Sequence, residues 1–378
     1  MKLIHLSDLH LGKRLCGFSL LDDQAYILDE LLDLVREEAP DAVLIAGDIY
    51  DKPVPPAEAV ALFDDFLVRL AACGAQVLLI SGNHDSAERL AFGGRLMDAR
   101  GVHVSPAYQG TLVPVTLDDP AGRVDIYLLP FLKPANVRRF FPDEAIESYT
   151  DAVRCALAHR QPGTGNRSVL VAHQFVTGAA TCESEELSVG GLDQVDAQAF
   201  AGFDYVALGH LHGPQQVGTP AMRYSGTPLK YSFSEAAHQK SVPIVTLDAP
   251  GQAEIRLAPL TPRRDLLERA GSYDTLTSRA FYSTFDQNAY LHLPLTAAQE
   301  IPDAIGKLRT IYPNIMRLDY QHTAGAGCAA LALGPQAERR TPIDLFDDFY
   351  QLQNDRPLSP EQRALLCGMI ETIWEGQE

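Results

Sequence analysis

Residues 77–85 read Val77-Leu78-Leu79-Ile80-Ser81-Gly82-Asn83-His84-Asp85. An apolar run of this length is typical of a buried strand, which tolerates polar side chains only at its end. This run ends at an amide, an imidazole and a carboxylate, which are side chains that bind metal ions or move protons. The pattern predicts a buried strand whose tip carries part of a functional site.

Four other runs in the chain have the same form. They read Ile4-His5-Leu6-Ser7-Asp8-Leu9-His10, Ala42-Val43-Leu44-Ile45-Ala46-Gly47-Asp48, Val169-Leu170-Val171-Ala172-His173 and Tyr205-Val206-Ala207-Leu208-Gly209-His210-Leu211-His212. Five strands with such tips can gather ligands that are far apart in sequence at one sheet edge. The five runs therefore predict a metal site. The alternative, a set of core histidines and turn aspartates, is disfavoured because all five runs end in this way.

Length and composition bound the class of protein. The chain has 378 residues and 46% hydrophobic content, enough for two or three domains with a sizeable core. Its six cysteines contain no C-x-x-C pair, which predicts a reducing compartment and argues against a cysteine zinc site. Only Lys2 precedes the first strand, and no apolar run approaches the ~20 residues of a membrane helix. We expect a soluble cytoplasmic protein.

The net charge is −18 and the sequence pI is about 5.0. Nucleic-acid binding normally draws on a basic surface. If this chain binds DNA, it must use local basic patches, metal ions or a more basic partner.

The first 258 residues read as an α/β domain. Apolar residues at helical spacing predict helices over 20–37 and 57–72, after the first two strand tips. Strand–helix–strand repetition implies parallel strands with helices on their faces. Residues 110–132 and 217–258 read as antiparallel β structure, which predicts a second layer of sheet.

The C-terminal third is organised differently. Residues 259–265 read as a linker, 266–322 as a small α+β domain and 323–340 as a flexible segment. In the small domain we expect strands at 290–293 and 315–320 and a helix at 304–311. Capping patterns at Thr341-Pro342 and Ser359-Pro360 predict a helical hairpin over 341–378. This hairpin either folds back on its own domain or offers an apolar stripe to a partner helix.

The ordered pattern D-x-H, G-D, G-N-H-D, H, G-H-x-H resembles the calcineurin-like metallophosphoesterase superfamily. The resemblance implies a four-layer αββα sandwich with two divalent ions, which together neutralise a phosphodiester and activate a water. It implies Asp8, His10 and His212 at the first ion, Asn83, His173 and His210 at the second, and Asp48 bridging both. Mixed imidazole and carboxylate ligands suit Mn²⁺, with Mg²⁺ as the alternative.

Two more residues of the G-N-H-D run receive roles from this resemblance. His84 is expected to face the scissile phosphate as a general acid or a charge stabiliser, rather than to bind an ion. Asp85 is expected to orient His84, as carboxylates do for catalytic histidines. His5, His159, His238, His292 and His322 are expected to be structural or surface residues.

The strand tips, the segment Arg223-Tyr224-Ser225-Gly226-Thr227-Pro228 and the run Asp344-Leu345-Phe346-Asp347-Asp348-Phe349-Tyr350 are similar to the SbcD nuclease-subunit family. This resemblance implies a DNA exonuclease and endonuclease that acts at double-strand ends, hairpins and single strands, in DNA repair and recombination. It implies an ATP-dependent complex with SbcC, an ATPase whose coiled coil the 341–378 hairpin would grip. Residues 266–322 would cap the active site and help to select DNA.

The resemblance also implies a homodimer within a heterotetramer, for which segments 54–72 and 86–99 could supply the interface. Candidate phosphate contacts are Lys13, Arg14, Lys52, Arg89, Arg95, Lys133, Arg138 and Arg139. The chain departs from archaeal and eukaryotic relatives at Asp51, where they carry a second histidine linked to exonuclease activity. The balance of exonuclease and endonuclease activity therefore stays open.

Two other functions remain as alternatives. A stand-alone phosphatase or phosphodiesterase would need only residues 1–258 and leaves the C-terminal third unexplained. A non-catalytic assembly subunit would keep the fold for partner binding alone, and the full ligand set speaks against it.

Overall fold

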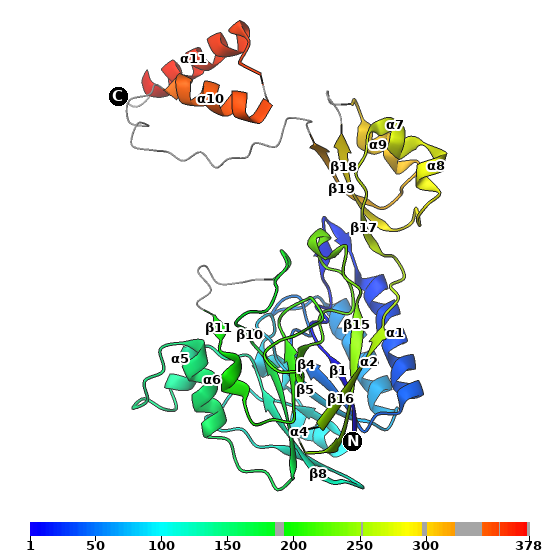
Figure 1. The fold of residues 1–378 in the computed structure, drawn as a ribbon, viewed down its shortest axis with the longest axis vertical. Coiled ribbons are helices and arrows are strands. Elements are labelled where there is room, and N and C mark those ends of the chain that lie inside the picture. Colours follow the sequence, from blue (N-terminus) through cyan, green and yellow to red (C-terminus); the bar gives the residue numbers. More distant parts are fainter. Residues whose placement is uncertain (186–192, 251, 297–300, 322–341, 355, 376–378) are drawn as a thin grey trace. The chain divides into compact units, whose positions relative to one another are not determined.

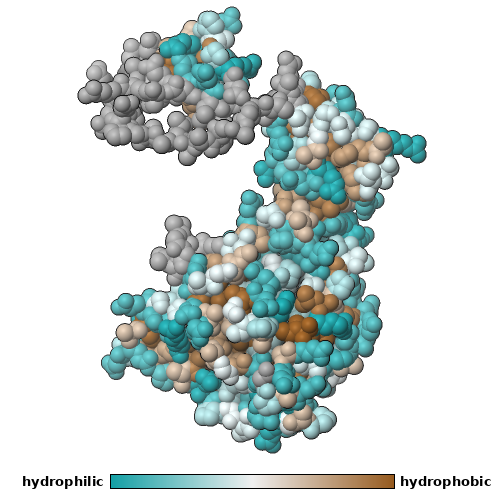
Figure 2. Space-filling view, viewed as in Figure 1, coloured by the Kyte–Doolittle hydropathy of each residue, from teal (hydrophilic) through white to brown (hydrophobic). Residues whose placement is uncertain are grey.

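The structure is a computed structural model, which describes residues 1–185, 193–250, 252–296, 301–321, 342–354 and 356–375. The chain divides into two units, Met1–Leu267 and Glu268–Glu378 (Figure 1). The visible face of the first unit is mostly polar, with apolar patches between the polar residues (Figure 2). None of the helices among the described residues has the length and apolar content needed to cross a membrane.

The first unit contains two six-stranded sheets, of which the first has the order β16-β15-β1-β4-β5-β6. Four of its strands run parallel: β1 (Lys2–Leu6), β4 (Ala42–Ala46), β5 (Gln76–Ile80) and β6 (Val102–Val104). The hairpin of β15 (Ser241–Ala249) and β16 (Gln252–Pro259) adds antiparallel strands to β1. Helices α1 (Leu21–Glu38) and α2 (Ala57–Ala71) lie beside this sheet, so the two predicted helices are confirmed within one residue (Figure 1).

The second sheet has the order β13-β14-β12-β9-β8-β7. Its strands are β7 (Val115–Asp119), β8 (Gly122–Leu129), β9 (Arg167–His173), β12 (Tyr205–Gly209), β13 (Gln215–Gln216) and β14 (Met222–Tyr224). The predicted antiparallel pairing is right for β7–β8 and β15–β16. It is wrong for β8 with β9 and for β12 with β14, which are parallel pairs.

The main core lies between the two sheets. Successive side chains of a strand face opposite sides, so alternate residues of each sheet point inward. Leu44, Leu78 and Val245 of the first sheet join Ile126 and Val171 of the second in one buried cluster. On the outer side, α5 (Pro134–Arg138) and α6 (Tyr149–Ala158) contribute Val137 and Val153 to a separate cluster with the second sheet. Helices therefore flank both sheets, and the predicted αββα sandwich is confirmed.

Glycines let the tips of the two sheets approach each other. A Cβ atom at Gly209 would lie 1.9 Å from the carbonyl oxygen of Ala46, across the sandwich. A Cβ atom at Gly82 would lie 2.1 Å from Oδ1 of Asp48. Real Cβ atoms do not come so close to other atoms, and only glycine permits such backbone approach. These glycines each precede a predicted metal ligand, so close packing brings the ligands together.

The second unit begins with a small three-stranded sheet in the order β17-β18-β19. The strands are β17 (Leu266–Glu268), β18 (Tyr290–Thr296) and β19 (Ile315–Gln321), with helices α7 (Tyr273–Thr277), α8 (Arg279–Tyr282) and α9 (Ala304–Arg309). The expected strands at 290–293 and 315–320 and the helix at 304–311 are present, with small shifts at their ends. The sequence analysis missed β17, α7 and α8, which are too short for a periodic pattern to form.

Two helices close the chain, α10 (Pro342–Asn354) and α11 (Pro360–Glu375). At the start of α11, the Gln362 N–H donates to Oγ of Ser359 at 3.2 Å, and the Ser359 N–H donates to the Gln362 amide oxygen at 2.9 Å. This reciprocal pair is the capping box expected there. An ion pair between Arg363 and Asp347 links the two helices. The expected cap at Thr341 and the segment 323–340 lie outside the described residues.

Candidate metal centre

The predicted ligands follow the carboxyl ends of strands in both sheets. Asp8, His10, Asp48 and Asn83 come after β1, β4 and β5 of the first sheet. His173 ends β9, and His210 and His212 follow β12, in the second sheet. The expectation of one sheet edge is therefore wrong. Two edges meet across the sandwich, because the parallel strands of each sheet end on the same side.

Asp48 lies between two sets of imidazoles. Its Oδ2 atom is 3.7 Å from Nε2 of His10 and 3.3 Å from Nε2 of His173. Its side chain is almost fully buried. A carboxylate that faces ligands on both sides is what a bridging position between two ions requires.

The first set of donors comprises Asp8, His10 and His212, whose ligand atoms lie within 4.8 Å of one another. Nε2 of His10 is 3.2 Å from Nε2 of His212. Asp8 is held in place by the backbone N–H of His210, which donates to its Oδ1 and Oδ2 at 3.0 and 3.2 Å. Burial, opposed by nearby His173, raises the pKa of Asp8 to about 6, so it is mostly ionised at neutral pH.

The second set meets at the amide of Asn83. Its Oδ1 atom is 3.0 Å from Nε2 of His173 and 2.9 Å from Nδ1 of His210. Asp8, Asp48 and His173 also form a group whose donor atoms lie within 4.8 Å. Carboxylate, imidazole and amide donors that converge from both sides of one carboxylate fit a pair of divalent ions.

The backbone is strained at four of these positions. Asp8, His10, Asp48 and His210 have φ angles of 53, 44, 50 and 108°. Residues with a Cβ atom rarely adopt positive φ, at a cost of about 1–3 kcal/mol each. Such strain persists where the surrounding structure enforces it, and it gathers here at the predicted ligands.

Hydrogen bonds behind the ligands set which nitrogen of each imidazole faces the centre. Nδ1 of His173 is 2.8 Å from the Ala46 carbonyl oxygen, and Nδ1 of His212 is 2.7 Å from Oγ of Ser184. A neutral imidazole that donates from Nδ1 presents its Nε2 lone pair to a metal. Both Nε2 atoms therefore point their lone pairs into the centre.

A buried charged chain extends behind His212. Oγ of Ser184 donates to Oε1 of Glu235 at 2.6 Å, and Nζ of Lys240 contacts Oε2 of Glu235 at 2.5 Å. Glu235 is fully buried. Burial would raise its pKa, but the hydrogen bond with His212 and the attraction of Lys240 hold that pKa well below its usual range. The sequence analysis missed these residues, since no local pattern marks them.

We expect Glu235→Gln to weaken metal binding at the first set of ligands. The substitution removes the negative charge that His212 faces and leaves Lys240 buried without its counter-ion. Loss of such a supporting partner costs about 10–100-fold in metal affinity. Titration of the metal-free protein with Mn²⁺ measures this loss, with the exposed Glu254→Gln as the matched control. Equal affinities in the two variants would contradict a supporting role for Glu235.

His84 lies at the edge of the centre. Its backbone N–H donates to Oδ1 of Asp48 at 2.9 Å, and its Nδ1 is 3.1 Å from the Asp51 carbonyl oxygen. Its ring packs edge-on against His10, with 4.8 Å between centroids. Donation from Nδ1 to Asp51 leaves Nε2 to face a substrate. The structure thus places His84 beside the donor atoms, while its catalytic role remains a prediction.

The structure corrects the role expected for Asp85. Its carboxylate accepts hydrogen bonds from the backbone N–H groups of Ile49, Tyr50 and Gly82 at 3.0 to 3.1 Å. The partner of the His84 ring is the Asp51 carbonyl, so Asp85 does not orient that ring directly. Asp85 instead joins the loops after β4 and β5, because a carboxylate in this tight turn reaches backbone donors first.

Metal binding should release a proton from His173. Burial lowers the pKa of His173, but attraction to Asp48 outweighs it and raises that pKa to about 9 in the metal-free protein. Burial lowers the pKa of His210 to about 3, so His210 is already neutral at pH 7. A metal ligand must be neutral imidazole, so Mn²⁺ must displace the proton on His173.

We therefore expect release of about one proton per chain at pH 7 and an affinity that rises about tenfold per pH unit up to pH 9. Calorimetric titration in two buffers of different ionisation enthalpy counts the protons. An affinity for Mn²⁺ that does not change between pH 7 and pH 9 would contradict this assignment.

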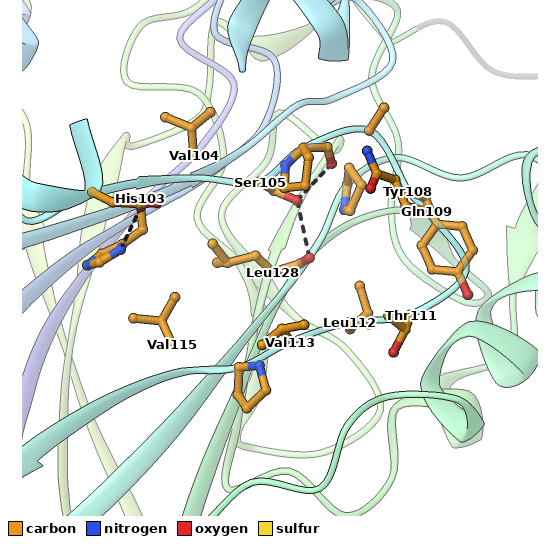
Figure 3. A pocket seen from close by; sticks show the side chains of 15 residues that line it. His103, Val104, Ser105, Tyr108, Gln109, Thr111, Leu112, Val113, Val115 and Leu128 are labelled. Carbon is orange, nitrogen blue, oxygen red and sulfur yellow. Dashed lines mark hydrogen bonds and ion pairs between the residues drawn. The ribbon is translucent and has the colours of Figure 1, made fainter. Parts of the chain in front are cut away.

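A cavity of about 570 Å³ lies elsewhere in the first unit (Figure 3). It is lined by residues that include His103, Tyr108, Leu112 and Leu128, and Oγ of Ser105 donates to the Pro106 carbonyl at 3.1 Å. None of its lining residues is a predicted ligand, so this cavity is separate from the metal centre.

Family comparisons agree with this arrangement. Residues 1–214 match the model of the calcineurin-like phosphoesterase family, and residues 262–354 match that of the type 5 capsule protein repressor C-terminal domain. The SbcD chain of the nuclease SbcCD from Staphylococcus epidermidis is 32% identical over 382 residues, which is 99% of each chain. Its namesake from Staphylococcus saprophyticus is 35% identical over 325 residues, or 85% of each chain.

Among solved structures, a dimetal phosphatase from Danio rerio aligns with 68% of this chain and 96% of its own. Its TM-score is 0.40 at 12% identity, a similarity too weak to support any functional conclusion.

Proposed function

The chain belongs to the SbcD family of calcineurin-like phosphoesterases, and we propose that it hydrolyses phosphodiester bonds of DNA as the nuclease subunit of a complex with an SbcC-type ATPase. The observation that carries this proposal is Asp48, which lies between two sets of metal donors with His84 beside it. The family implies divalent metal ions, and we propose Mn²⁺ as the preferred metal because imidazoles dominate the donor set.

The residues divide the work in the following way. Asp8, His10 and His212 would hold one ion, Asn83, His173 and His210 the other, and Asp48 both. When bound, the two ions supply a nucleophilic water and neutralise the phosphate. His84, which is half-buried, would present Nε2 to the scissile phosphate and stabilise or protonate the leaving oxygen. Asp85 would fix the two loops that carry Asp48 and Asn83.

The C-terminal hairpin supports a coiled-coil partner. Phe346, Phe349, Leu365 and Met369 of α10 and α11 are 39, 47, 67 and 53% exposed. Exposed large apolar side chains on helices suit a groove or helix of another chain. We propose that residues 341–378 bind the ATPase and that 266–322 cap the nuclease domain formed by 1–258. The partner would supply much of the basic DNA-binding surface that this acidic chain lacks.

Near the centre, Lys13 is the basic residue with the clearest link to it. Nζ of Lys13 contacts Oδ1 of Asp51 at 2.7 Å, and Asp51 is the residue whose carbonyl holds His84. We propose that Lys13 contacts a DNA phosphate there. The described cysteines Cys16, Cys73, Cys155, Cys182 and Cys367 are free thiols, which supports a reducing, cytoplasmic compartment.

The test is cleavage of an end-labelled DNA hairpin with Mn²⁺, with and without the ATPase subunit, beside bis-p-nitrophenyl phosphate. DNA cleavage that requires or is stimulated by the partner and ATP supports the nuclease subunit. Turnover of the small diester with DNA untouched, even in the presence of the partner, would identify a stand-alone phosphodiesterase instead.

We also propose a homodimer through segments 54–72 and 86–99. These segments expose apolar side chains, of which Phe92 and Leu96 are 86 and 81% exposed. The double substitution Phe92→Glu and Leu96→Glu should weaken dimerisation by about 30-fold or more, since buried anchors of this size contribute about 2 kcal/mol or more. Light scattering after gel filtration measures the mass, and Val113→Glu, at another exposed apolar site, is the control. A variant that stays dimeric would place the interface elsewhere.

A further inference from the structure

A second group of metal-binding side chains lies outside the centre described above. Glu144, Cys155 and His159 offer donor atoms that lie within 4.8 Å of one another. Cys155 is on α6, His159 follows the last residue of that helix, and Glu144 precedes it in the chain. None of the three is a ligand of the two-metal centre. We propose that they form a third metal site, for Zn²⁺ or a similar thiophilic divalent ion.

Helical spacing brings two of the donors together. Residues four apart lie on the same face of a helix, so Cys155 and His159 are neighbours. Sγ of Cys155 is 3.7 Å from Nδ1 of His159. Stacking of Phe141 on the His159 ring, with 4.0 Å between centroids, fixes that ring over the helix end. The pair is therefore positioned before any ion binds.

The imidazole presents a suitable nitrogen to the third donor. Nδ1 of His159 is 3.0 Å from the Cys155 carbonyl oxygen, and donation to this carbonyl leaves the lone pair on Nε2. Nε2 is 3.4 Å from Oε1 of Glu144. Two ligands of a tetrahedral zinc, at about 2.0 to 2.1 Å from the ion, lie about 3.4 Å apart. The Glu144 side chain is 45% exposed and free to adjust.

The donor types select the ion. A thiolate, an imidazole and a carboxylate form a mixed set that favours Zn²⁺ over Mn²⁺, Mg²⁺ or Ca²⁺. Burial and the Glu144 carboxylate raise the pKa of the Cys155 thiol to about 12, so the ion must displace a proton that only a strongly thiophilic metal removes. Three protein ligands leave a fourth position for solvent or a small anion. The single cysteine explains why a search for C-x-x-C pairs argued against such a site.

Cobalt distinguishes this site from the two-metal centre. A thiolate bound to Co²⁺ gives an intense near-ultraviolet charge-transfer band, which nitrogen and oxygen ligands do not give. We expect the full chain to develop this band on titration with Co²⁺ and to bind one more Zn²⁺ than its Cys155→Ser variant. The half-buried Cys182→Ser serves as control and should keep both the band and the extra zinc.

A second variant guards against misfolding of Cys155→Ser. His159 is 41% exposed, so His159→Gln should fold normally and weaken Zn²⁺ binding at this site by more than about tenfold. Circular dichroism checks the fold of each variant. The proposal is overturned if the wild type shows no thiolate band with excess Co²⁺, or if Cys155→Ser retains that band. None of these readouts depends on cleavage of DNA.

Discussion

Substitution of Asp48 by Asn should abolish cleavage by this protein. Asp48 is the carboxylate between the two sets of donors, 3.7 Å from His10 and 3.3 Å from His173. Asn is nearly the same size and keeps an oxygen to accept the His84 N–H, but it brings no negative charge to two cations. Loss of metal-based charge stabilisation of several kcal/mol corresponds to a fall in rate of at least about 10³-fold.

Metal content and thermal unfolding separate this explanation from a general loss of structure. Wild type should unfold at a higher temperature when Mn²⁺ is added, because ligands that bind the folded state stabilise it. Asp48→Asn should bind less metal and show little of this stabilisation, with an unchanged circular dichroism spectrum. Asp64→Asn, an exposed aspartate on α2, is the matched control. Full metal content together with normal cleavage in Asp48→Asn would exclude the bridging role.

The ligands were predictable because each carries a local signal. An apolar run that stops at Asp48 or His173 shows both the strand and the place of its tip. The two sheet edges were not predictable in this way. Which strands pair, and the approach of Gly209 to Ala46, depend on contacts between residues far apart in the chain. The sequence therefore indicated the ligands and the layers, whereas the parallel pairing of β8 with β9 emerged only in the structure.

The residues that support the ligands show the same limit. Glu235 and Lys240 form a buried ion pair behind His212, yet in the sequence they read as ordinary surface charges. For Asp85 the neighbouring position suggested contact with His84, but the turn directs its carboxylate to backbone N–H groups. Direct sequence neighbours share a chain path and not always a side-chain direction, so such roles need coordinates.

Substitution of His84 by Gln should leave the metals bound and slow DNA cleavage by about 10²–10⁴-fold, the usual contribution of a positioned acid or base. His84 contacts Asp48 through its backbone N–H, which the substitution keeps. Its ring is available because Nδ1 is engaged with the Asp51 carbonyl. Metal content and hairpin cleavage are measured together, with His103→Gln, which lines the separate cavity, as control. Loss of metal in His84→Gln would make His84 a ligand instead.

The leaving group then tells which role His84 has. The sugar hydroxyl of DNA is a poor leaving group and benefits from a proton in the transition state, whereas p-nitrophenolate departs without one. If His84 acts as general acid, His84→Gln should slow DNA cleavage strongly and hydrolysis of bis-p-nitrophenyl phosphate only slightly. If it stabilises charge on the phosphate, both reactions should slow by a similar factor. Undiminished cleavage of both substrates would remove His84 from the chemistry, although its ring lies beside His10.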